Sequence, residues 1–206
     1  MGKSNMSILL IQKNNNKNSN AFGSKFNQFT SKMRSLSFSV FTMVVLSSCA
    51  NAGNSGDSQL TDANIAAIVV GANNIDISAG KIALARSSNP EVRKFAQTMI
   101  TDHTAVLNSA VALVTRLGVT PVNNELVAVL SKQSSEHEAV LKTLSGAEFD
   151  KAYIDHEVVY HKAVIGVIED QLIPGASNKE LKDTLISVLP AFIAHLKHCE
   201  MIQSNL

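Results

Sequence analysis

Five stretches of residues 61–206 carry apolar side chains at helical spacing, and a cap or turn signal bounds each of them. They run from Thr61 or Asp62 to about Arg86, from Pro90 to Gly118, from about Asn124 to Leu144, from Ser145 to Pro174, and from Ser177 to about Gln203. No segment alternates with the two-residue period of a strand. The pattern predicts an all-α domain of four long helices, with a shorter third helix in the crossover between the second and fourth.

The ends of these helices are predicted from individual residues. Asn89 before Pro90 is a typical N-cap, and Gly118 is a typical C-terminal cap. Two pairs, Ser145 with Glu148 and Ser177 with Glu180, have the spacing of capping boxes. Pro190 lies inside the last helix, where we expect a kink because proline removes one backbone hydrogen bond.

Composition limits the class of protein. Hydrophobic residues make up 45% of the chain and charged residues 17%, which is ordinary for one globular domain. The formal net charge is only +1, so the chain lacks the basic excess that would bind a phosphate backbone, and we expect no nucleic-acid partner.

The first 59 residues differ from the rest. Residues 1–48 contain a polar, low-complexity start and then an apolar run, Leu36 to Leu46, which is the size of a signal-peptide core and too short to span a bilayer. Met33 would give a signal of more normal length as the start of the chain, which leaves residues 1–32 as an annotation artefact. Residues 49–59 read as a flexible tether before a helical domain at 60–206.

The end of the apolar run, Leu46-Ser47-Ser48-Cys49, resembles the lipobox of bacterial lipoproteins. This resemblance implies cleavage before Cys49 and a lipid on that residue, which would attach the protein to a membrane of the cell envelope. Ala50 stands where Asp would mark inner-membrane retention in many such proteins, so the expected location is the outer membrane. An ordinary secretory signal with a chance cysteine is the alternative.

Each long helix places one ionisable residue at the centre of its apolar stripe, as judged from about 100° of rotation per residue. These residues are Asp76, His103, His156 and His195. Helical rise places the two members of each hairpin, Asp76 with His103 and His156 with His195, at nearly the same height. An unpaired charge in a core is costly, so four such groups indicate a shared site.

Two interpretations of these four residues remain. Three imidazoles and a carboxylate are suitable ligands for Zn, Fe, Mn or Cu. Alternatively, they form a hydrogen-bonded polar network in which Asp76 accepts from the histidines. In either case Tyr153, Tyr160, His198 and Cys199 are expected to surround the group.

Other polar residues are expected outside this group. His137 is flanked by acids and is expected to be solvated. Glu157 and His161 are spaced i,i+4, and His161 lies about 140° around the helix from His156, so Glu157 and His161 are expected to form a pair at the surface or edge of the fourth helix.

Three segments resemble the ferritin-like bacterial family known as domain of unknown function 4142: "GKIALARSSNPEVRKFAQTMITDHTAVLNSAVALVTRLGV", "LKTLSGAEFDKAYIDHEVVYHKAV" and "LPAFIAHLKH". The family's Asp-His-Thr pattern falls on Asp102, His103 and Thr104, and its later histidines fall on His156 and His195, the latter after Leu189 and Pro190. Asp76 replaces the usual Glu of the first helix. The resemblance implies an exported ferritin-like four-helix bundle and supplies no activity.

The carboxylates of the usual di-iron motif, Glu-x-x-His, are missing, because Ile100, Tyr153 and Phe192 stand three residues before His103, His156 and His195. We therefore consider three functions: a metal-binding envelope protein, a structural or stress-related envelope protein with a polar core, and a metal-dependent oxidoreductase. The chain has no phosphate loop, nucleophile elbow or Cys-His dyad, so we expect a binding or structural protein rather than an enzyme.

Overall fold

The structure is a computed structural model that describes residues 60–206. The predicted signal peptide, the predicted lipidation site at Cys49 and the predicted tether lie outside the described residues. Helices α2 (Asp62–Arg86), α3 (Pro90–Arg116), α4 (Glu125–Thr143), α5 (Gly146–Val167) and α7 (Lys179–Gln203) account for most of the described chain. A π-helical turn, η2 (Ile168–Leu172), and a short helix, α6 (Ile173–Gly175), continue α5 up to the turn before α7. Residues 60–206 contain no strand, so the all-α prediction is confirmed.

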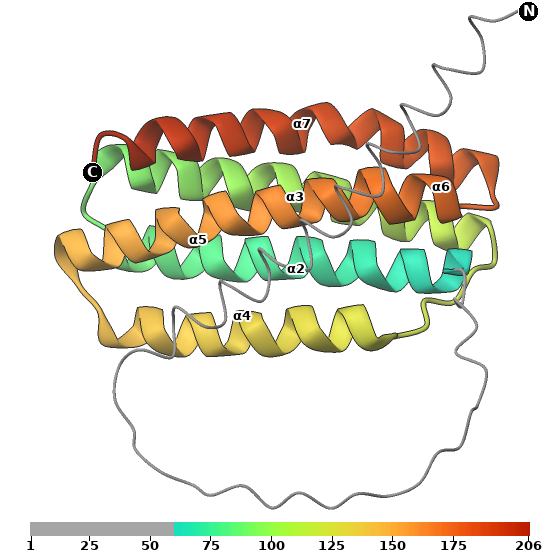
Figure 1. Cartoon of the computed structure of the whole chain (residues 1–206), viewed down its shortest axis with the longest axis horizontal. Coiled ribbons are helices and arrows are strands. Elements are labelled where there is room, and N and C mark those ends of the chain that lie inside the picture. The colour runs from blue at the N-terminus through green and yellow to red at the C-terminus, as the bar shows by residue number, and fades with distance from the viewer. Residues whose placement is uncertain (1–59) are drawn as a thin grey trace, which may run out of the picture. The chain divides into compact units, whose positions relative to one another are not determined.

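The long helices lie side by side (Figure 1). Helix α2 packs on α3, and α5 packs on α7, so each consecutive pair forms a hairpin. The shorter α4 connects the two hairpins and packs against α2 and α5. As a result, α5 contacts α7 and α4, as well as α2.

The helix starts follow local capping chemistry. Asn89 Oδ1 accepts hydrogen bonds from the N–H groups of Glu91 and Val92, and Pro90 occupies the first turn, as predicted. Helix α3 ends at Arg116, and Gly118, just beyond its end, has a φ of 65°, a conformation that costs glycine little.

Two predicted capping boxes do not form. Ser145 is the N-cap of α5, but its side chain makes no capping hydrogen bond. The N-cap of α7 is Asn178 rather than Ser177, since Asn178 Oδ1 accepts from the N–H groups of Glu180 and Leu181. The Ser177 N–H instead donates to the Asp62 carboxylate at 2.9 Å, which ties the start of α7 to the start of α2. Pro190 lies inside α7, and the kink expected there stays a prediction.

A close approach between α2 and α3 sets the level of the polar residues in the core. A Cβ added to Gly80 would lie 3.0 Å from the backbone oxygen of Ala96, so only glycine fits between the two helices without a shift. Asp76 lies one turn before Gly80 on α2. This contact therefore helps to bring Asp76 up to His103 on α3.

One apolar cluster fills the core beside the polar residues. It contains aromatic and aliphatic side chains from all five long helices, among them Ala83, Phe95, Met99, Leu141, Phe149, Ile154 and Ile202. Tyr153 and Cys199 also belong to it. The polar residues described next are buried in the same bundle as this cluster.

Candidate metal centre

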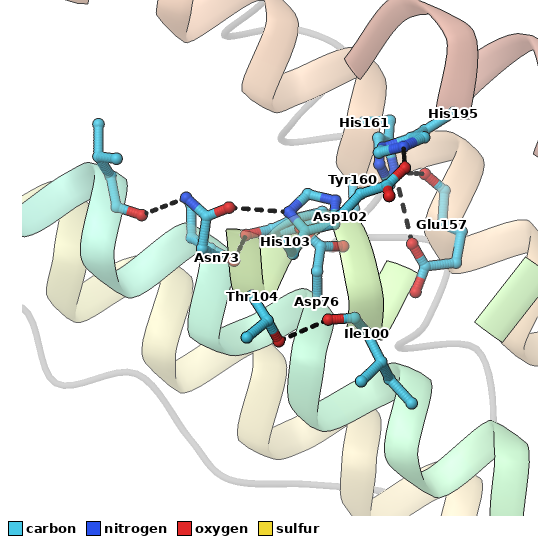
Figure 2. Close-up of polar contacts among 12 residues, drawn as sticks. Asn73, Asp76, Ile100, Asp102, His103, Thr104, Glu157, Tyr160, His161 and His195 are labelled. Atoms are coloured by element: carbon cyan, nitrogen blue, oxygen red, sulfur yellow. Dashed lines mark hydrogen bonds and ion pairs between the residues drawn. The ribbon is translucent and has the colours of Figure 1, made fainter. Parts of the chain in front are cut away.

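Three histidine rings from three different helices meet in the core: His103 of α3, His161 of α5 and His195 of α7 (Figure 2). Their ring centroids are 5.2 Å apart for His103 and His195, 5.6 Å for His161 and His195, and 5.8 Å for His103 and His161. One ring nitrogen of each lies within 4.8 Å of the others. His103 and His161 are fully buried and His195 is 6% exposed.

The His103 ring is oriented by Asn73 of α2. Asn73 Nδ2 donates to the Val69 carbonyl at 2.8 Å, so its Oδ1 faces the ring and accepts from His103 Nδ1 at 3.0 Å. Because Nδ1 is the donor, Nε2 of the neutral ring carries a lone pair. His103 Nε2 is buried and has no hydrogen-bond partner.

His161 is oriented by its own helix. Its Nδ1 donates to the Glu157 carbonyl one turn earlier, at 3.0 Å. The Glu157 Oε2 lies 3.4 Å from the same nitrogen. The other nitrogen, Nε2, is buried without a partner.

His195 is oriented by Asp102, the residue before His103. His195 Nε2 lies 2.9 Å from Asp102 Oδ2, and its Nδ1 is buried without a partner. The Asp102 side chain is 46% exposed, so this pair lies where the centre comes closest to solvent. In all three rings, an acceptor fixes one nitrogen and the other nitrogen has no partner. The same arrangement occurs in metal sites, where hydrogen-bond acceptors beyond the ligands orient the histidine rings.

Two buried carboxyl groups adjoin the histidines. Asp76 Oδ2 lies 3.4 Å from His103 Nδ1, and Glu157 lies beside His161 (Figure 2). Asp76, Glu157 and His161 form a second group whose ligand atoms lie within 4.8 Å of one another. Both oxygens of Asp76 and Oε2 of Glu157 have no hydrogen-bond partner. Such buried unpaired atoms are rare in folded proteins and are consistent with an ion at this place.

Burial and neighbouring charges determine the protonation of these groups. Burial lowers the pKa of His103 to about 2, with help from the charges of His161 and His195, so the ring is neutral. Burial also lowers the pKa of His195, against the effect of Asp102. Burial raises the pKa of Asp76 well above its ordinary value, and Glu157 raises it further. Burial opposes charge on His161, but Glu157 and Asp76 outweigh it and raise the pKa to about 9.

The structure brings together three of the four residues predicted from the apolar stripes, Asp76, His103 and His195. The fourth, His156, turns away from them and stacks on His137 of α4, with ring centroids 3.6 Å apart and an angle of 8° between the rings. The expected solvation of His137 is wrong, since it is 6% exposed.

The expected surface position of Glu157 and His161 is also wrong, since they are 1% and 0% exposed. The cause is that α5 is covered on more than one side: His156 faces α4, and His161 faces α3 and α7. Asn73 was missed as well, and its place beside Asp76 near the apolar stripe of α2 is the signal that could have found it.

Of the residues expected around the site, Tyr160 lies next to the histidines, whereas the others lie in or against the apolar cluster. Tyr160 donates its hydroxyl to the Ala72 carbonyl at 3.1 Å and lies between His156 and His161. Tyr153 is fully buried and its hydroxyl has no partner. Cys199 donates to the Leu196 carbonyl, and burial raises the pKa of its thiol to about 12. His198 packs edge-on against Phe95, away from the three histidines.

Comparison with known proteins gives a family and a shared fold. Curated proteins give no match. Solved structures of CopM in the Cu(II)-bound form and in the Ag-bound form obtained by soaking are similar, with TM-scores of 0.54 and 0.56. Both are 18% identical to this chain and cover 71% of it, and 98% and 97% of their own chains are covered. The model of the domain of unknown function 4142 matches residues 47–202, and the chain therefore belongs to the DUF4142 family.

Proposed function

We propose that this protein is a lipid-anchored, ferritin-like helical bundle of the cell envelope that binds a transition-metal ion through His103, His161 and His195. The proposal is based on an arrangement that the three rings have in common. Each is buried, each has one nitrogen fixed by an acceptor, and each keeps the other nitrogen without a partner. Imidazole nitrogens are suitable ligands for Zn, Cu, Fe and Ni.

The similar solved structures support metal binding as the first function to test. CopM is described in Cu(II)-bound and Ag-bound forms, and its fold resembles that of this chain. Because the sequence identity is low, the ligands of CopM are not transferred to this chain, and its candidate ligands are identified from its own residues. Among these, the three histidines each offer one ring nitrogen from a different helix, and these nitrogens lie within 4.8 Å of one another.

Metal binding is tested by titrating the purified protein with Cu(II) and Zn(II) and measuring bound metal and melting temperature. We expect one tightly bound equivalent at the histidines, a higher melting temperature with metal, and a lower one with chelator. His195→Ala should abolish this binding. His198→Ala, three residues along the same helix, is the matched control and should leave it intact. Sub-stoichiometric metal with no effect of chelator would refute the proposal.

A hydrogen-bonded polar core is the second candidate. The 3.4 Å contacts of Asp76 with His103 and of Glu157 with His161 favour it, because they pair buried polar groups within the protein itself. In that case the same residues would serve only structure, as in a structural or stress-related envelope protein. The titration above separates the two candidates.

Membrane attachment rests on Leu46-Ser47-Ser48-Cys49 at the end of the apolar run. Cys49→Ser should release the protein from the membrane fraction, since the lipid would then be missing. Separation of the inner and outer membranes should place the wild-type protein in the outer membrane. Unchanged membrane binding of Cys49→Ser would refute the lipid anchor.

A further inference from the structure

One apolar ring contacts all three histidines of the centre. The ring centroid of Phe192, on α7, lies 5.0 Å from that of His103, 6.1 Å from that of His161 and 6.3 Å from that of His195. Phe192 is 3% exposed, so it lies inside the bundle with them. Among the other aromatic side chains of residues 60–206, none has recorded ring contacts with all three. Phe192 therefore covers one face of the triangle that the histidines form.

The four rings stand at the corners of a nearly regular tetrahedron. The three distances from the Phe192 centroid span 5.0–6.3 Å, and the three distances among the histidine centroids span 5.2–5.8 Å. A tetrahedral metal site takes one ligand from each of its four corners. In this chain three corners carry an imidazole, whereas the fourth carries a phenyl ring, which has no lone pair to donate.

Phe192 reaches this corner through the helix that also carries His195. The two residues are three apart in sequence, so they lie on the same side of α7. The spacing is that of the Glu-x-x-His motif, in which the first residue adds a carboxylate to the metal. Phenylalanine at this position fills the corner and supplies no ligand atom.

We propose that Phe192 closes the centre, because it denies the ion a fourth ligand and keeps water and small anions away from it. The inference rests on the proposed function, since it concerns an ion bound by His103, His161 and His195. Catalytic metal sites keep one position open for water or substrate, whereas closed sites hold the ion without such an exchange. The centre is therefore built to hold a metal ion rather than to let a small molecule react on it.

Azide tests the closure, because it binds to Cu(II) that has a free coordination position and changes the visible spectrum of the ion. The purified full chain is loaded with one equivalent of Cu(II) and titrated with azide. We expect no azide-dependent change in the wild-type spectrum. Phe192→Ala opens the corner, so azide should add a charge-transfer band and bind at least about tenfold more tightly than to wild type.

Phe95→Ala is the matched control. Phe95 of α3 is also buried, and its recorded ring contacts are with Tyr153 and His198, away from the three histidines. Both variants remove the same side chain from the core, so both are expected to lose stability. Only Phe192→Ala should admit azide, and circular dichroism confirms that both variants are folded.

Phe192→His is an independent test that leaves no large cavity. An imidazole at this corner adds a fourth nitrogen, and Zn(II) is almost always four-coordinate, so Zn(II) affinity should rise at least about tenfold. Unchanged Zn(II) affinity in folded Phe192→His would overturn the closure. So would an azide response of wild-type protein or Phe95→Ala that equals the response of Phe192→Ala. Wild-type protein that binds neither Cu(II) nor Zn(II) would instead refute the metal-binding function itself.

Discussion

Five buried histidines fall into two groups that differ in how their rings are held. His103, His161 and His195 each have one nitrogen fixed by an acceptor on the protein. His137 and His156 lie between α4 and α5 and are held face to face, with an unpartnered buried nitrogen on each ring. The difference shows that burial alone does not make a histidine a candidate ligand. An acceptor fixes one nitrogen of each ring in the first group, and neither ring of the second group has such an acceptor among residues 60–206.

The sharpest test of this comparison uses two histidines of the same helix. His161→Ala should lower metal affinity at least about 100-fold, because it removes one of three ligands, whereas His156→Ala should change it less than about threefold. Equilibrium dialysis with Zn(II) measures both variants, and circular dichroism confirms that they are folded. An equal loss in a folded His156→Ala variant would show that the two groups are not separate.

A smaller effect should follow from removing an acceptor without touching a ligand. Asn73→Leu keeps the approximate size of the side chain but leaves His103 Nδ1 without its acceptor, which should lower metal affinity about 10- to 100-fold. Asn74→Leu, at the exposed neighbouring position of α2, is the control and should bind metal normally. Wild-type affinity in Asn73→Leu would mean that packing alone orients the His103 ring.

The stacked pair of His137 and His156 should make the unfolding free energy depend on pH. Burial lowers the pKa of His137 to about 4, so the folded state disfavours the protonated ring. Its contribution to stability is fully present above pH 6.5 and is lost as pH falls toward 4. Between pH 6.5 and 5.5 this loss amounts to about 1 kcal/mol. Urea unfolding of wild type and His137→Phe at both pH values should show a smaller decrease in the variant, and equal decreases would contradict the prediction.

Tyr160 touches both groups and gives the smallest expected effect. Tyr160→Phe removes the hydrogen bond to the Ala72 carbonyl but keeps the ring beside His156 and His161. We expect a loss of about 0.5–1 kcal/mol in unfolding free energy and unchanged metal affinity. A large loss of metal affinity would show that the hydroxyl takes part in the centre.

The helices could be predicted from the sequence because their ends depend on local chemistry. Asn89, Pro90 and Gly118 determine the limits of α3 with little help from the rest of the fold. Ser177 failed as a cap for an equally local reason: the next residue, Asn178, is also a strong cap. Local sequence patterns of this kind are enough to predict the all-helical architecture and the family.

The inner face of α5 could not be predicted in this way. A rule based on one apolar stripe assumes one buried face, but α4 covers a second face of α5, so both His156 and His161 are buried. Only the packing of α4 decides which of them faces α3 and α7. The same holds for Glu157, whose charge suggested a surface position and whose neighbour His161 instead makes a buried partner.

The three histidines of the centre come one each from α3, α5 and α7, and no two of them are neighbours in sequence. An unfolded chain, or any single helix cut from it, therefore has no preformed chelate for the ion. Under the proposed function, metal affinity and folding free energy are therefore two measures of one equilibrium, as is general when a site exists only in the native state. Under the proposed export, the chain would fold and bind the proposed ion only on the far side of the membrane, so the metal ions available in that compartment would determine which ion it binds.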